Sequence, residues 1–130
     1  MLKKTVLIAE DNGIISLDLK ILLKKFNIDS EVIRDPGFLF EKTRLLRPDL
    51  IIADLNLKDK QQVKDALSEI SRTYHIPIII ITSSLKTRVN EFAGGLSSCS
   101  VLSEPFDTSE LLLLIQKYIF FEPMINYCRT

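Results

Sequence analysis

Short apolar runs alternate with longer segments of helical spacing along the whole chain. Runs rich in β-branched residues lie at Thr5–Ala9, Ser30–Arg34, Asp49–Asp54, Ile76–Thr82 and Cys99–Ser103. Three of these runs are nearly continuously apolar, which is typical of parallel strands that are covered by helices on both faces. The spacing therefore predicts five strands of a parallel sheet.

Helices are predicted between and after these strands. The first has apolar residues at i, i+4, i+7 and i+11: Ile15, Leu19, Leu22 and Phe26. The others are predicted at Gly37–Leu46, after a proline that suits a first helical turn, at Gln62–Tyr74, at Thr87–Phe92, and from Ser109 to Phe121.

Five alternations of strand and helix predict one doubly wound α/β domain, because parallel strands need a helical crossover between them. The length of 130 residues suits a single domain, which we place at residues 1–122, with a C-terminal tail at 123–130. The first residues resemble a natural start, so we expect a stand-alone protein.

Charge and composition exclude several classes of function. Seventeen Lys and Arg balance seventeen Asp and Glu, so we expect no nucleic-acid partner and no electrostatic attachment to a membrane. The apolar start stops at Glu10, too early for a signal peptide, and Gln116 and Lys117 interrupt the last apolar helix. Cys99 and Cys128 have no metal-ligand spacing, and we expect a cytoplasmic protein with reduced thiols.

Candidate chemistry lies where strands end, since sites in doubly wound folds lie outside the carboxyl ends of the strands. These positions hold Glu10 and Asp11, Asp54, Thr82 with Ser83, and Glu104. Several carboxylates at one edge are costly without a cation, and Mg²⁺ binds through one or two carboxylates, waters and phosphate oxygens. No glycine-rich phosphate loop is present, so a metal-assisted phosphoryl site is the resulting hypothesis.

Four motifs in order, "VLIAEDN", "DLIIADLNL", "IPIIIITSS" and "VLSEPFD", make the chain resemble the receiver domains of two-component response regulators over essentially its whole length. The resemblance implies a five-stranded parallel sheet in the order 2-1-3-4-5. It also implies a phosphoacceptor signalling domain rather than an enzyme that turns over an external substrate.

The resemblance assigns a role to each strand-end residue. Glu10 and Asp11 match the acid pair that helps bind Mg²⁺, and Asp54 matches the phosphoacceptor, which is also a metal ligand. Asn56 matches a metal ligand through its backbone carbonyl. Thr82 matches the hydroxyl that follows the phosphoryl group, and Ser83 matches the small residue after it.

The chain departs from the family pattern at Glu104, where a lysine usually pairs with the phosphoryl group. Two unit charges about 4 Å apart at an effective dielectric near 20 interact by roughly 4 kcal/mol, so this attraction becomes a repulsion of similar size. The resemblance also implies a cis peptide before Pro105. Val101 replaces the usual aromatic switch residue, and Lys58 or Lys60 is a candidate for supplying the missing positive charge.

Two functions therefore remain open. In the first, the domain accepts a phosphoryl group on Asp54 from a histidine kinase or phosphotransfer protein and signals to a downstream protein. In the second, it is a degenerate receiver that binds partners without phosphorylation. An aspartyl phosphatase would need an acid at Asn56, and a flavin site would need hydroxyls and glycines where "EDNGII" is acidic.

The last helix also suggests a partner surface. The segment "LLLLIQKYIFF" is apolar on nearly all sides, and burial against one sheet face is not expected to hide all of it. In the family, such excess apolar area serves dimers or targets, so we expect a possible homodimer through the face made by helix 4, strand 5 and helix 5. The alternative is that the C-terminal tail covers it.

Overall fold

A five-stranded parallel sheet forms the centre of the domain in the computed structural model, which describes residues 3–55, 60–83, 96 and 98–119. The strand order is β2-β1-β3-β4-β5, as the family resemblance implied. In chain order the elements are β1 (Lys4–Ala9), α1 (Gly13–Lys25), β2 (Ile28–Ile33), η1 (Pro36–Phe38), α2 (Leu39–Leu46), β3 (Leu50–Asp54), α3 (Lys60–Tyr74), β4 (Ile78–Thr82), β5 (Cys99–Ser103) and α5 (Thr108–Tyr118).

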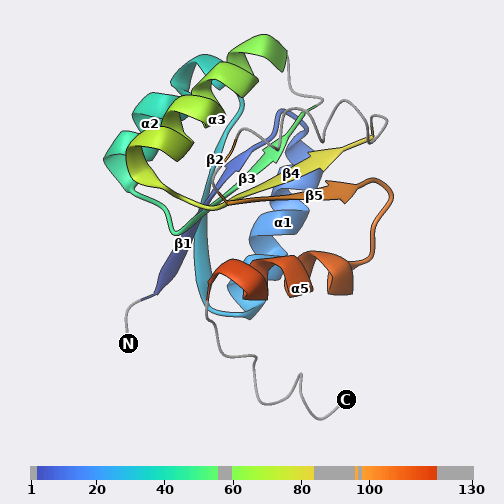
Figure 1. Ribbon diagram of the computed structural model, residues 1–130. Coiled ribbons are helices and arrows are strands. Elements are labelled where there is room, and N and C mark those ends of the chain that lie inside the picture. Colours follow the sequence, from blue (N-terminus) through green and yellow to red (C-terminus); the bar gives the residue numbers. More distant parts are fainter. Residues whose placement is uncertain (1–2, 56–59, 84–95, 97, 120–130) are drawn as a thin grey trace.

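Helices cover both faces of the sheet, so the protein has three layers. Helices α1 and α5 lie on one face and α2 and α3 on the other (Figure 1). Alternate residues of each strand enter the two cores: Val6 and Ile8 of β1 pack under α1 and α5, whereas Leu7 packs under α2 and α3. Every residue of β3 and β4 is buried, which explains why these runs lack polar alternation.

The predicted elements agree with the structure apart from their ends. The second helix is preceded by a separate 3-10 turn at Pro36–Phe38, which Asp35 caps by accepting a hydrogen bond from the Gly37 amide. Strand β4 begins at Ile78 rather than at Ile76, directly after Pro77, which has no N–H to give to a sheet. The helix predicted at 87–92 and the domain boundary at 122 lie outside the described residues.

The last helix differs most from its prediction. It ends at Tyr118, because Ile119 is extended, whereas the prediction ran to Phe121, which lies outside the described residues. Leu111, Leu112 and Ile115 are buried in the core that α1 shares, and among the residues described in α5 only Leu113 is a large apolar side chain that is mostly exposed. As expected, burial against one sheet face does not hide all of this helix, since Leu113 is 67% exposed, and Phe120 and Phe121 lie outside the described residues.

The three helices α1, α2 and α3 end in the same way. Asn27, Arg47 and His75 adopt positive φ angles of 61°, 50° and 57° at or just after the last helical turn. This left-handed conformation stops a helix, and although glycine is the usual residue, asparagine tolerates it well. Arg47 gains a compensating contact, since its guanidinium lies 4.5 Å from the centre of the Tyr74 ring.

Candidate phosphoryl and metal site

The register of the sheet brings four strand ends to one edge. Ala9 pairs with Ala53, so Glu10 and Asp54 follow side by side from β1 and β3. Thr82 ends β4 opposite Ser103, and the Glu104 amide, one residue later, donates a hydrogen bond of 2.8 Å to the Thr82 carbonyl. Parallel pairing alone thus gathers the residues that the sequence singled out.

Two of these residues form a buried carboxyl pair. Glu10 is 2% exposed and Asp54 is 7% exposed, and their side chains are joined by a hydrogen bond. Burial, followed by the hydrogen bond and the charge of Asp54, raises the pKa of Glu10 from 4.5 to about 7. Burial next to a second carboxyl group therefore favours the protonated form of Glu10.

The loop after β1 holds Glu10 in position through Asn12. The Asn12 amide donates a hydrogen bond of 3.0 Å to Oε1 of Glu10, which partly offsets the rise in pKa of that carboxyl. The Asn12 side chain caps α1, because its Oδ1 accepts hydrogen bonds from the amides of Ile14 and Ile15 at 2.9 and 3.1 Å. The first turn of α1 and the acid of the site are thus fixed by one residue.

Sequence reasoning missed Asn12. The signal was present, since asparagine immediately before a helix is a strong N-cap residue and "EDN" directly follows the first strand. The amide contact to Glu10 has no sequence signal of its own.

The other predicted residues lie around the pair. Thr82 is fully buried at the end of β4, whereas Asp11 and Ser83 are exposed. Glu104 is half-buried and follows β5, and the Glu104–Pro105 peptide is cis. Asn56, Lys58 and the Lys60 side chain lie outside the described residues.

The carboxyl pair has the chemistry of a divalent-cation site. Within the residues that the structure describes, no three side chains of His, Cys, Asp or Glu gather as a metal-binding group. However, Mg²⁺ commonly uses only one or two carboxylates and takes its remaining ligands from waters and phosphate. Glu10 and Asp54 would fit this donor set, because their carboxyl groups are buried next to each other at the ends of β1 and β3.

Similarity to known proteins agrees with this geometry. Residues 6–116 match the sequence profile described as "Response regulator receiver domain". The transcriptional regulatory protein PdtaR of Mycobacterium tuberculosis is 30% identical over 116 residues, which are 87% of this chain and 55% of that protein. The phyllosphere-induced regulator PhyR of Methylorubrum extorquens is 27% identical over 123 residues, covering 90% of this chain and 44% of that protein. The chain thus spans about half the length of these relatives.

Solved structures share the fold. The signal receiver domain of a modulated diguanylate cyclase from Desulfovibrio desulfuricans superposes with a TM-score of 0.78 at 24% identity, covering 91% of this chain and 94% of that one. The chemotaxis protein CheY4 of Vibrio cholerae has a TM-score of 0.79 at 21% identity, covering 91% of this chain and 100% of that one. In the described part of the chain, no helix is long and apolar enough to cross a membrane.

Proposed function

Because the chain belongs to the response-regulator receiver family, we propose that Asp54 accepts a phosphoryl group from a histidine kinase or phosphotransfer protein in the presence of Mg²⁺. The observation that carries the proposal is the buried contact between the carboxyl groups of Glu10 and Asp54 at the strand ends. A merely solvated loop end would not bury two hydrogen-bonded acids. A cytoplasmic location, where such kinases present their phosphohistidines, is part of the proposal.

In this mechanism an oxygen of the Asp54 carboxylate attacks the phosphorus of a phosphohistidine. A P–O bond forms, the P–N bond breaks, and the imidazole leaves with the electron pair. The buried Thr82 side chain ends the neighbouring strand, from which its hydroxyl would donate to a phosphoryl oxygen. Water would later hydrolyse the acyl phosphate and reset the switch.

Glu10, Asp11 and Asp54, with the backbone carbonyl of Asn56, would hold Mg²⁺. The ion supplies positive charge to the phosphoryl oxygens when it is bound. Glu10 must lose its proton to serve as a ligand, and the Asn12 amide already favours its charged form. This chain therefore supplies two adjacent carboxyl groups, those of Glu10 and Asp54, and one backbone amide, that of Asn12, which donates a hydrogen bond to Glu10.

Glu104 favours a second candidate function, in which the domain binds partners without phosphorylation. A carboxylate at residue 104 offers a phosphoryl group no ion pair, unlike the lysine that is usual in the family. Output in either case would go through protein contacts, including a possible homodimer through the face of helix 4, β5 and α5. The two functions differ in whether Asp54 is modified at all.

A phosphotransfer assay separates them. The protein is incubated with acetyl phosphate or phosphoramidate and Mg²⁺, and intact-protein mass spectrometry measures the added phosphoryl group. We expect labelling of the native protein and of Asp18→Asn, which removes an exposed aspartate of α1, but not of Asp54→Asn. An unlabelled native protein would leave only the phosphorylation-independent function.

A further inference from the structure

Arg34 follows the last residue of β2, at the same edge of the sheet as the carboxyl pair. The residues that directly follow the five strands are Glu10, Arg34, Leu55, Ser83 and Glu104. Arg34 is the one basic residue among these five, and two of the others are acids. Positive charge from a residue that directly follows a strand therefore comes from β2 alone.

The pairing of the strands puts Arg34 in one row with the carboxyl pair. Ala9 of β1 pairs with Ile33 of β2 on one side and with Ala53 of β3 on the other. One position further along the three strands, the row consists of Arg34, Glu10 and Asp54. The pairing continues into this row, because the Glu10 amide donates a hydrogen bond of 3.0 Å to the Ile33 carbonyl.

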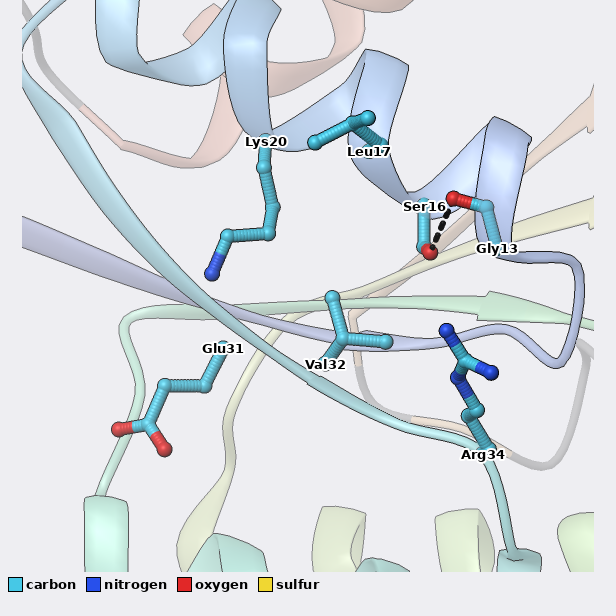
Figure 2. A pocket seen from close by; sticks show the side chains of 7 residues that line it. All are labelled: Gly13, Ser16, Leu17, Lys20, Glu31, Val32 and Arg34. Carbon is cyan, nitrogen blue, oxygen red and sulfur yellow. Dashed lines mark hydrogen bonds between the residues drawn. The ribbon is translucent and has the colours of Figure 1, made fainter.

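The side chains of this row also share one face of the sheet. Successive side chains of a strand alternate between the two faces. Two positions before the row, Ile8 and Ile52 belong to the core under α1 and α5, and Val32 packs against that core. The row therefore falls on the same face, and Figure 2 shows the Arg34 side chain directed toward the first turn of α1.

The spacing of the strands allows Arg34 to reach a phosphoryl group on Asp54. Neighbouring strands lie about 4.8 Å apart, so two spacings separate the Cα atoms of Arg34 and Asp54 by about 10 Å. When extended from Cα, an arginine side chain spans roughly 7 Å and an aspartyl phosphate roughly 6 Å. The guanidinium can therefore pass over Glu10 and meet the phosphoryl oxygens.

No acid in the described ranges forms an ion pair with the Arg34 guanidinium. Glu31 lines the same hollow, but its Oε1 lies 2.6 Å from Nζ of Lys42, and Figure 2 shows its carboxylate directed away from Arg34. Gly13 leaves room for the guanidinium, since a Cβ there would come within 3.2 Å of Nη2. Arg34 thus brings an uncompensated positive charge to the edge of the site.

We propose that Arg34 binds the phosphoryl group of Asp54 and supplies the positive charge that a lysine at position 104 supplies in the family. The inference rests on the proposed phosphorylation of Asp54. Arginine suits this role, because its planar guanidinium donates parallel hydrogen bonds to phosphoryl oxygens and does not lose its proton in proteins. The charge reaches the phosphoryl group from β2 instead of from β5.

The labelling assay with acetyl phosphate and Mg²⁺ tests this inference when it is followed over time. Intact-protein mass spectrometry measures the rate at which the native protein and Arg34→Gln gain the phosphoryl group. Arg34→Gln should be labelled about tenfold more slowly, since it loses a hydrogen bond to a charged group. Arg34→Lys keeps the charge without the planar fork, and its rate should lie between the other two.

A second pair of variants separates this role from a merely structural one. Glu104→Lys restores the cation that is usual in the family. In that background Arg34→Gln should slow labelling only about twofold, because two cations that serve the same phosphoryl group have non-additive effects. A residue that only supported the fold would cause the same loss in both backgrounds.

Arg72→Gln is the matched control. It removes an exposed arginine from the last turn of α3, at the opposite edge of the sheet from the carboxyl pair, and should leave the rate within about twofold of the native value. Calorimetric titration with MgCl₂ in the absence of phosphodonor should show no loss of affinity in Arg34→Gln, because removal of a cation does not weaken the attraction of acids for Mg²⁺. Circular dichroism checks that every variant folds.

Several results would overturn the inference. Equal labelling rates for the native protein and Arg34→Gln would do so while the phosphorylation of Asp54 still stands, as would an equal loss in the Glu104→Lys background. Slower labelling of Lys58→Gln or Lys60→Gln, with Arg34→Gln unchanged, would assign the positive charge to the residues after β3. A native protein that takes no label would overturn the proposed function, and this inference with it.

Discussion

The raised pKa of Glu10 predicts that the free energy of unfolding falls as pH rises through about 7. In the unfolded chain this glutamate loses its proton near 4.5, but in the folded protein burial and Asp54 keep it protonated up to about pH 7. Folding is therefore coupled to proton uptake between these values. The stabilisation is fully present below pH 4.5 and is lost as pH rises through the folded pKa.

The size of the effect follows from the two pKa values. A change from 4.5 to about 7, at about 1.4 kcal/mol per pKa unit, corresponds to about 3 kcal/mol. This is a large part of the stability of roughly 5–15 kcal/mol that domains have. Glu10→Gln keeps the shape and one hydrogen-bonding group but carries no charge at any pH, so it should escape the loss.

Urea unfolding followed by circular dichroism at pH 4.5, 6, 7 and 8, in EDTA, measures this difference. Near pH 4.5 the two proteins should unfold at similar urea concentrations, and by pH 8 Glu10→Gln should be more stable by about 3 kcal/mol. Glu69→Gln, which removes an exposed carboxylate of α3, controls for the general loss of a negative charge. A difference between native protein and Glu10→Gln that stays constant with pH would refute the reasoning.

Three further predictions concern the loop, the strand-five end and the last helix. Asn12→Ala should lower the free energy of unfolding by about 1 kcal/mol in the same assay and weaken Mg²⁺ binding in calorimetry, because the helix loses its N-cap. Asn12→Asp keeps the cap acceptor and should retain most of the stability. Equal losses of stability in both variants would contradict the capping role. Glu104→Lys should stabilise the phosphorylated state by roughly 1.5–3 kcal/mol, the worth of a hydrogen bond to a charged group. Amide NMR spectra of β5 and α5 with and without phosphodonor measure this response, and an unchanged response would indicate that the site has been abandoned. Leu113→Ser should reduce any dimer seen by sedimentation, since this side chain is 67% exposed on α5, and a native protein that is monomeric at all concentrations would remove the dimer proposal.

The sheet and its site were predictable because they depend on pattern. Continuous apolar runs predicted β3 and β4, and the rule that parallel strands end at one edge placed Glu10, Asp54 and Thr82 together from the sequence alone. The strand order came from the family resemblance rather than from periodicity, and the structure has that order.

Side-chain environments were less predictable, because they depend on what a residue packs against. The run of apolar residues in α5 does not reveal which of them are buried: Leu111, Leu112 and Ile115 enter the core shared with α1. Likewise, the sequence alone does not show that the side chains of Ile14, Leu17 and Ile21 are exposed, because their spacing is that of one amphipathic helix. Only the position of α1 at the β2 edge of the sheet separates its buried side from its open side.

The hydrogen bond from the Glu104 amide to the Thr82 carbonyl has a consequence for how such domains diverge. This bond uses only main-chain atoms, so the end of β5 is anchored whatever side chain residue 104 carries. Codons for glutamate and lysine differ at their first base alone. A single point mutation can therefore exchange the charge at this position in either direction while leaving the main-chain bond intact, so residue 104 is free to change its charge in evolution without a cost to the architecture.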